Sequence, residues 1–340
     1  MSAKVISLFE AIGFSWLVSF MKFFSFQNPK EQIEMLVRNL GVPIFAFAIF
    51  LGIWHVAASQ VNTSLGKMPG PAAVWEQSLN LWDEHKAERE KEKAFIKRQE
   101  ERNAKKLAKN PDAKVKIRDY TGKPTYIDQI VTSLKTVFTG FLLASVIAIP
   151  LGIICGLSNT IYTALNPIIQ LFKPVSPLAW LPIVTLVVSA LYVGNDTYFA
   201  KSFVNSAITV TLCCLWPTLI NTTVGVSSIN EDLLNVSKVL RLNFFTKITK
   251  IVLPSSVPMI FTGLRLSLGV GWMVLIAAEM LAQNPGLGKF VWDEFQNGSS
   301  QSLGRIMVAV LTIGFIGFLL DRLMLSLQKS FSWDKDAIVR

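Results

Sequence analysis

The chain has 340 residues, of which 51% are hydrophobic and 16% are charged, and its formal net charge is +10. Soluble domains carry about a quarter charged residues, and here 26 of the 56 charged side chains lie within residues 61–128 alone. The rest of the chain consists of long apolar stretches between short polar turns. The composition therefore excludes an ordinary soluble domain and predicts an all-α, polytopic membrane helix bundle.

The positive charge does not indicate nucleic-acid binding, because Lys and Arg lie at segment ends and in one mixed-sign block rather than on an aromatic-studded basic stripe. The three cysteines, Cys155, Cys213 and Cys214, lie inside apolar runs, where a thiol is usually a small packing group. Their spacing fits neither a disulfide framework nor a zinc site. We expect no metal site and no bound cofactor.

Residues 1–40 are predicted to form a cytoplasmic or interfacial N-terminal segment. Val5 to Phe26 are apolar and aromatic, but Glu10 and Lys22 interrupt them, and no small-residue cleavage site of a secretory signal follows. We expect a helix that lies on the membrane surface, with a membrane span as the alternative.

Six segments approach the roughly 20 apolar residues that a helix needs to cross a bilayer. The third is short and bounded by prolines, so we expect it to be broken or oblique. Lys and Arg gather near both termini and between the fourth and fifth spans, which places these regions in the cytoplasm. The predicted spans are Gly41–Ser59, Thr136–Leu157, Leu178–Val193, Phe203–Val224, Met259–Leu281 and Ile306–Leu325.

The spans divide the chain into a first span at 41–60, a charged extracytoplasmic insert at 61–128, a core at 129–327 and a cytoplasmic tail at 328–340. Within the core, small residues at helical spacing indicate close helix contacts. The pairs are Gly152 with Gly156, Ser267 with Gly271, and Gly314 with Gly317. They predict a packed bundle.

The charged insert contains a stretch from Asp83 to about Ala108 that is rich in Glu, Lys, Arg and Ala and poor in turn formers. Pairs such as Glu88 and Lys91 fall at helix-neighbour spacing. An outer position does not conflict with the positive charge, because loops longer than about 60 residues escape the positive-inside rule. We expect a solvated helix laced with salt bridges, with a docking surface for a partner as the alternative.

The connection from residue 225 to residue 258 is cytoplasmic and amphipathic. Asn230, Glu231 and Asp232 mark a helix start, and apolar residues then recur at helical spacing. A second helical piece is expected from Phe244 to Leu253, ending at Pro254. The apolar face of these helices lies either in the lipid headgroups or against a protein partner.

This connection resembles the cytoplasmic EAA loop of ABC-importer permeases, whose pattern is Glu-Ala-Ala, three residues, Gly, nine residues, Ile, one residue and Leu-Pro. Ile251, Leu253 and Pro254 match the end of the pattern at the required spacing from position 241. The start of the loop departs from the pattern. This departure affects the fine geometry with which the loop would dock on a partner, and not the identity of the loop. The departing residues are Asn235, Val236 and Ser237 in place of Glu-Ala-Ala, and Arg241 in place of Gly.

Flanking blocks resemble the nitrate, taurine and alkanesulfonate branch of these importers over residues 129–327. Phe290–Asp293 and Asp321–Arg322 are most similar to the nitrate, nitrite, cyanate and bicarbonate subgroup. The other blocks are Ser176–Pro182, Phe261–Arg265, Ala278–Leu281 and Gly286–Gly288.

The resemblance implies an inner-membrane permease that forms a homodimer, couples to cytoplasmic ABC ATPase subunits and receives a small anion from a periplasmic binding protein. Nitrate is the first choice, with bicarbonate, cyanate and sulfonates as alternatives. The chain contains no Gly-x-x-x-x-Gly-Lys-Ser/Thr loop, so ATP would be hydrolysed by another subunit and no catalytic residue is expected. The implied coupling residues are Leu233, Leu234, Asn235, Val236, Ser237, Lys238, Leu240, Arg241, Ile251, Leu253 and Pro254.

Polar side chains at membrane depth are costly and often functional. Glu279, near the outer end of the fifth span, is interpreted as a gate or pairing group, or as a cap on a loop. Arg265 meets an exiting anion, pairs with Asp321 or snorkels to the headgroups. The other candidates for the substrate pathway are Thr139, Ser176, Trp180, Trp216 and Asn221.

Two other classes of protein are less consistent with the sequence. A secondary transporter that works without ATP predicts an inverted repeat or ionisable residues at the midplane, and neither is convincing here. A membrane enzyme would need a nucleophile–base pair or a metal-spaced cluster around Glu279, Asp293, Glu294 or His55, and the sequence shows none.

Overall fold

The computed structural model describes residues 34–63, 66–110, 115–192, 199–299 and 301–331. The predicted surface helix at Val5–Phe26 lies outside these residues. Five described helices are long and apolar enough to cross a membrane, and a sixth span results if one bent pair counts as a single crossing. Apart from a short hairpin, in which β1 (Asn62–Thr63) pairs antiparallel with β2 (Gly66–Lys67), these parts are helices and loops. The predicted all-α membrane bundle is confirmed.

Each predicted span has a helix in the structure. The π-helical turn η1 (Val37–Gly41) leads into α4 (Val42–Gln60). The later single spans are α6 (Tyr126–Leu157), α9 (Lys201–Ser227), α12 (Leu253–Ala282) and α14 (Ser302–Phe331).

The predicted third span corresponds to the second half of a bent helix pair. α7 (Asn159–Phe172) and α8 (Pro177–Leu191) meet at an angle of 100°. Pro174 lies in the turn between them, and Pro177 is the first residue of α8, where a missing N–H costs no helical hydrogen bond. The bend lies at the prolines that predicted it.

The core of the bundle is α9, which packs against α6 on one side and α12 on the other. Glycines allow this close approach. A Cβ added to Gly152 would lie 2.6 Å from Cβ of Thr222, and one added to Gly271 would lie 2.5 Å from Sγ of Cys214. The predicted small-residue contacts are therefore real at Gly152 and Gly271, whereas Gly314 has no heavy atom near its Cβ position within 4 Å.

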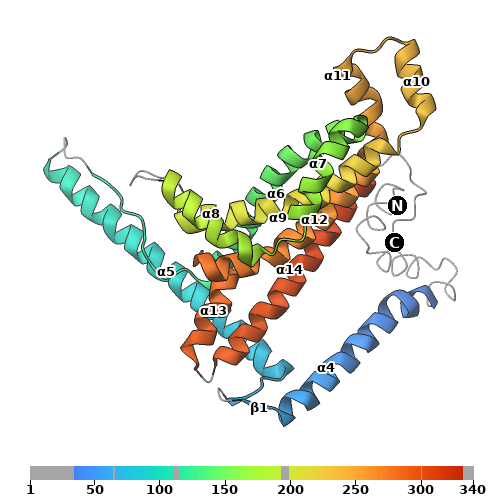
Figure 1. The fold of residues 1–340 in the computed structure, drawn as a ribbon. Helices are drawn as coiled ribbons and strands as arrows, with labels where there is room; N and C mark the ends of the chain where they lie inside the picture. Colours follow the sequence, from blue (N-terminus) through green and yellow to red (C-terminus); the bar gives the residue numbers. More distant parts are fainter. Residues whose placement is uncertain (1–33, 64–65, 111–114, 193–198, 300, 332–340) are drawn as a thin grey trace, which may run out of the picture.

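The bundle has two distinct ends (Figure 1). One carries α10 (Glu231–Val239), α11 (Phe244–Lys247) and the π-helical turn η2 (Ile248–Val252), and we call it the α10 end. The other carries α13 (Leu287–Asn297) and the β1–β2 hairpin. α4 diverges from the other spans, as Figure 1 shows, and none of its apolar window is buried.

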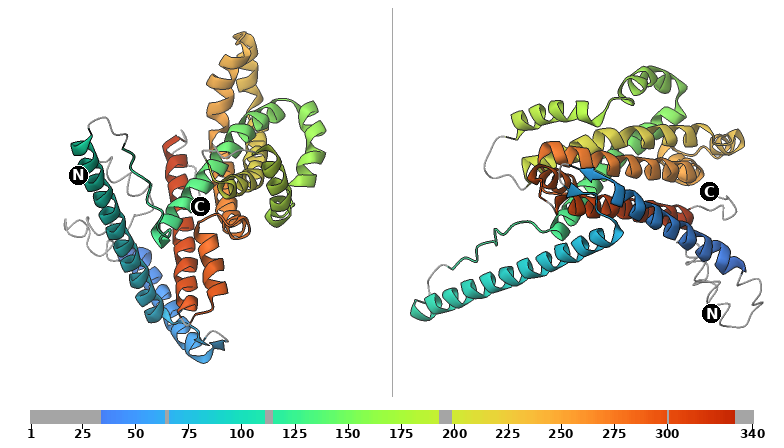
Figure 2. Two further views of the ribbon diagram at one scale, coloured as in Figure 1. Left: turned by 90° about the vertical axis from the view of Figure 1, so that its left-hand side faces the viewer. Right: turned by 90° about the horizontal axis from the view of Figure 1, so that it is seen from below.

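The charged insert contains one long helix, α5 (Pro71–Lys109), which starts at the end of the bundle opposite to α10 (Figure 1). α5 runs across the direction of the spans and projects beyond the bundle (Figures 1 and 2). Arg305 of α14 anchors its first half through ion pairs with Glu84 of α5 and Glu294 of α13. The predicted Glu88–Lys91 pair is present at 3.2 Å.

The segment that follows α5 runs back along it to the start of α6. The Gln99 side chain exchanges two hydrogen bonds of 2.8 Å with the Arg118 backbone. Tyr120 donates a hydrogen bond of 2.6 Å to Glu88, and this bond holds the pKa of the Glu88 carboxyl group below its ordinary value. The predicted solvated helix, α5, is therefore held by these hydrogen bonds to the return segment that follows it.

Candidate functional site

The α10 helix is held rigidly at both of its ends. Asn230 caps its start, because the Asn230 side chain accepts a hydrogen bond of 2.9 Å from the Asp232 N–H. At its end, the Arg241 N–H donates to the Lys238 carbonyl and the Leu242 N–H to the Ser237 carbonyl, both at 3.0 Å. These paired bonds form a Schellman motif.

The Schellman motif explains what the EAA pattern requires at position 241. Arg241 has φ +49°, in the left-handed region, where glycine is favoured because it lacks a Cβ. The EAA pattern has Gly at this position, and Arg241 takes a backbone conformation that glycine favours. The arginine is therefore compatible with the Schellman motif that ends α10.

The two faces of α10 have different surroundings. Leu234 packs on a cluster at this end of the bundle formed by Ile153, Val226, Ile229 and Val252, and Ser237 is buried beside it. The opposite face exposes apolar side chains, with Val239 81% and Leu240 63% accessible. A shallow hollow of about 390 Å³ lies on this face, lined by Asp232, Asn235, Val236, Val239 and Leu240. Leu234 and Ser237, both predicted coupling residues, thus face the bundle.

The second helical piece of the loop does not end at Pro254 as predicted. Helix continues without a break from Phe244 through Pro254 to Ala282. The proline is the second residue of α12, directly after η2, and its fixed φ is compatible with helix. Ile251 and Leu253 are half-buried and Pro254 is exposed. Because the helix is continuous, α11, η2 and α12 form one helical rod, and α10 is joined to it by a turn.

Glu279 is fully buried at the α13 end of α12. Its carboxyl oxygens accept hydrogen bonds from the Ser133 hydroxyl at 2.8 and 2.9 Å and from the Gly288 N–H at 3.0 Å. The Leu287 N–H donates to the same Ser133 hydroxyl at 2.8 Å. Glu279 therefore joins α6, α12 and the start of α13, as in the predicted role of a cap.

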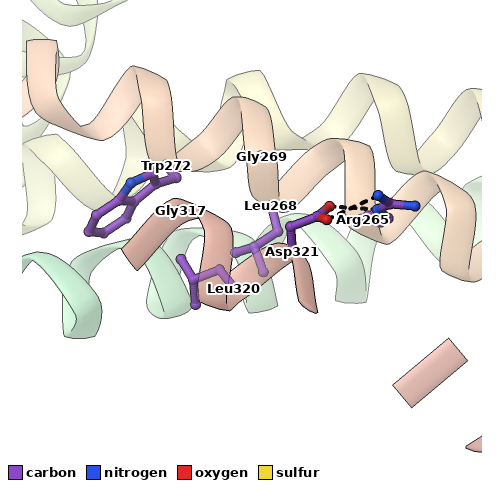
Figure 3. Close-up of a pocket in the computed structure, with 7 residues that line it drawn as sticks. All are labelled: Arg265, Leu268, Gly269, Trp272, Gly317, Leu320 and Asp321. Atoms are coloured by element: carbon purple, nitrogen blue, oxygen red, sulfur yellow. Dashed lines mark hydrogen bonds and ion pairs between the residues drawn. The ribbon is translucent and has the colours of Figure 1, made fainter. Parts of the chain in front are cut away.

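Arg265 pairs with Asp321, one of the alternatives that the sequence left open. Its Nε and Nη2 atoms donate to the two Asp321 oxygens at 2.5 and 3.0 Å. Figure 3 shows the two side chains pointing toward one another from α12 and α14, with Trp272 farther along α12. They border a cavity of about 240 Å³ whose other lining residues are Leu268, Gly269, Trp272, Gly317 and Leu320. The arginine charge is thus neutralised in this conformation.

The remaining pathway candidates do not meet at one place. Trp180 and Trp216 both pack on Phe172, at ring distances of 5.6 and 6.3 Å, and Ser176 caps α8 beside them through a 3.3 Å bond to the Leu178 N–H. The Thr139 hydroxyl donates to the carbonyl of Lys135, and the Asn221 amide to that of Pro217, each within its own helix.

Residues 148–333 match the family described as "Binding-protein-dependent transport system inner membrane component". The chain belongs to this family. It is therefore a multi-pass inner-membrane protein with the permease fold, and its homologues are transport permeases.

The permease is similar in sequence to three proteins that are themselves named as permeases. It is 39% identical over 196 residues to a protein of Leptolyngbya laminosa named nitrate import permease protein NrtB, which covers 58% of this chain and 65% of the relative. It is 41% identical over 202 residues to the bicarbonate transport system permease protein CmpB of Synechocystis sp., covering 59% and 67%. A probable ABC transporter permease of Brucella abortus aligns over 304 residues at 27% identity, covering 88% and 98%.

Sequence reasoning missed the partners of the permease's buried polar groups. Ser133 and Gly288 around Glu279, and the 3.2 Å bond from Asn284 to Thr136 beside them, carry no recognisable spacing in the sequence. Within the described residues, no group of His, Cys, Asp or Glu is arranged to hold a metal ion.

Proposed function

We propose that the chain is the membrane-spanning permease subunit of an ATP-driven importer of a small inorganic anion, with nitrate as its first substrate. The exposed apolar face of α10 carries this proposal. Val236, Val239 and Leu240 are 49%, 81% and 63% accessible on a helix whose two ends are both fixed. A rigid apolar surface of this kind at the end of a membrane bundle favours a protein partner, because contiguous exposed apolar patches mark interaction sites.

The partner of this surface is a cytoplasmic ATPase subunit, which hydrolyses ATP in place of the permease. Leu234 connects α10 to the cluster that contains Ile153 of α6, Val226 of α9 and Val252 of η2. A displacement of α10 is therefore transmitted to three helices together, since packed side chains move as a unit rather than deform. Two permease copies form a homodimer with an ATPase below each, and ATPase closure alternates access to the pathway.

Nitrate is supported by relatives named as nitrate import permeases, which match this chain at 38–39% identity. Relatives named as bicarbonate permeases match at 38–41%, so bicarbonate is the first alternative, followed by cyanate and sulfonates. A periplasmic binding protein would deliver the anion at the α13 end and supply much of the selectivity. The remaining alternative is a secondary transporter that works without ATP.

Reconstitution separates these alternatives. The chain is incorporated into proteoliposomes alone and together with its ATPase subunits and binding protein, and uptake of labelled nitrate is measured with and without ATP. We expect uptake only from the complete system with ATP. Uptake by the chain alone would identify a secondary transporter, and preferential uptake of labelled bicarbonate by the complete system would overturn nitrate as the substrate.

A further inference from the structure

One face of α7 is polar along the whole length of the helix. Its polar side chains recur at intervals of three and four residues, the spacing of one helix face, and they border a groove against α9 of about 330 Å³. Thr223 and Ser227 of α9 line the opposite wall. The α7 residues in the groove are Asn159, Tyr162, Asn166, Gln170 and Lys173, and we call them the polar stripe.

The polar stripe lies at membrane depth. α7 is the first half of the bent helix pair that is together long and apolar enough to cross a membrane. Phe172 at the end of α7 stacks on Trp216, midway along α9. The flank formed by Ile161, Ile168 and Leu171 is exposed and apolar, as a lipid-facing surface should be. Amides and a charge facing lipid tails would cost several kcal/mol per unpaired group, so the stripe faces water or protein.

The groove has the electrostatics of an anion site. Lys173 lies at its deep end, and within the described residues no carboxylate is in ion-pair distance of this lysine. No Asp or Glu lines the groove. The only hydrogen bond between members of the stripe is a long one, 3.4 Å from Gln170 to Asn166, so most amide donors and the ammonium group remain free for a ligand. An intramembrane cation without a partner marks an ion path more often than a structural contact.

We propose that the polar stripe is an anion-binding site on the α10 side of the transport pathway. Lys173 supplies the charge, and the amides of Asn166 and Gln170 supply hydrogen-bond donors to a small oxyanion. The identity of the anion rests on the proposed function. The site is separate from the Arg265–Asp321 pair, whose arginine is already neutralised.

The first test measures transport by the complete system, permease with ATPase subunits and binding protein, in proteoliposomes. We expect Lys173→Gln to lower nitrate uptake about tenfold or more, the factor that corresponds to about 1.4 kcal/mol, while ATP hydrolysis stimulated by the binding protein continues. Lys173→Arg keeps the charge and should keep most of the uptake. Lys201→Gln, at the opposite end of α9, is the matched control and should behave as wild type. Unchanged uptake by Lys173→Gln overturns the proposal.

The second test does not depend on nitrate. Asn166→Cys in the intact complex is labelled with a negatively charged and a positively charged methanethiosulfonate reagent, with the parent chain correcting for the buried native Cys155. We expect the anionic reagent to react faster, and Lys173→Gln to remove this preference. Equal rates for the two reagents overturn the site. If the reagents show the preference but the complete system with the unsubstituted chain takes up no nitrate, the site is supported and the proposed function is contradicted.

Discussion

Removal of the Glu279 side chain should destabilise the α13 end of the bundle. In Glu279→Ala, the Ser133 hydroxyl and the Gly288 N–H each lose their acceptor in a buried site. Each unsatisfied buried donor costs about 1–3 kcal/mol. The Ser133 hydroxyl can turn to a carbonyl of its own helix, so we expect a loss of roughly 2–4 kcal/mol in the free energy of unfolding, toward the lower part of the summed range.

Thermal unfolding of the purified permease in detergent measures this loss. At about 2 °C per kcal/mol for a unit of roughly 200 residues, the midpoint should fall by roughly 4–8 °C. Glu279→Gln keeps one acceptor oxygen and should lose less than Glu279→Ala. Asp293→Asn is the matched control, because Asp293 is an exposed carboxylate on α13 that pairs with Lys289 at the surface, where an ion pair contributes less than about 1 kcal/mol.

Equal midpoints for Glu279→Ala and Asp293→Asn would refute this reasoning. They would mean that the hydrogen bonds around Glu279 exchange with water in the native protein. A normal midpoint together with lost transport would instead return Glu279 to the role of a gate.

Three further predictions concern other parts of the permease. Val239→Glu places a charge on the exposed face of α10 and should abolish co-purification of the ATPase subunits while leaving the permease folded. Arg265→Gln and Asp321→Asn should each lower the thermal midpoint more than the double variant does, with a coupling of roughly 0.5–3 kcal/mol, because each single change leaves one charge unpaired. The Tyr120 hydrogen bond lowers the pKa of Glu88, so it stabilises the contact between α5 and the return segment at pH values above the ordinary carboxyl pKa, and this stabilisation is lost as the pH falls through the folded pKa. Tyr120→Phe removes the bond and should reduce the hydrogen-exchange protection of residues 115–122 at neutral pH.

Each of these predictions has its own control and contrary outcome. Gln301→Glu adds the same charge at an exposed position at the α13 end and should leave ATPase binding intact; if Val239→Glu also leaves it intact, α10 is not the coupling surface. Additive losses in the two single variants of the Arg265–Asp321 pair would mean that the pair contributes nothing to stability. Unchanged protection in Tyr120→Phe, after correction for the intrinsic exchange rate at each pH, would show that the Tyr120–Glu88 bond does not hold the return segment, which then depends on contacts such as those of Gln99 and of the ring on Phe95.

Much of the fold could be predicted because the bilayer reduces the problem to length and apolarity. Inside lipid a backbone must satisfy its own hydrogen bonds, so a sufficiently long apolar run can only be a helix. All six predicted spans accordingly have a helical counterpart, and a bend of 100° lies at the prolines that precede the third. The prediction failed at Pro254, where a proline near a helix start was interpreted as a helix end although its φ allows the helix to continue.

The candidate sites were predictable only in part, because their partners are remote in sequence. Helical periodicity identified the apolar residues of α10, but it could not assign Leu234 to the bundle and Val239 to the exposed face, since both belong to one amphipathic helix. Ser133 reaches Glu279 across 146 residues, and no local spacing announces that contact. The polar stripe of α7 is visible in the sequence as a pattern, yet only its position against α9 gives it a groove.

The amino-acid sequence by itself determined that this is a membrane bundle with a rigid amphipathic loop, because hydrophobic length, helical period and loop charge are local properties that the bilayer converts directly into structure. The tertiary structure decided which buried polar groups are already paired, as Glu279 and Arg265 are, and which remain open to a ligand, as Lys173 does. That distinction depends on distances between helices, and these are set by packing at contacts such as Gly152 against Thr222 rather than by any single segment.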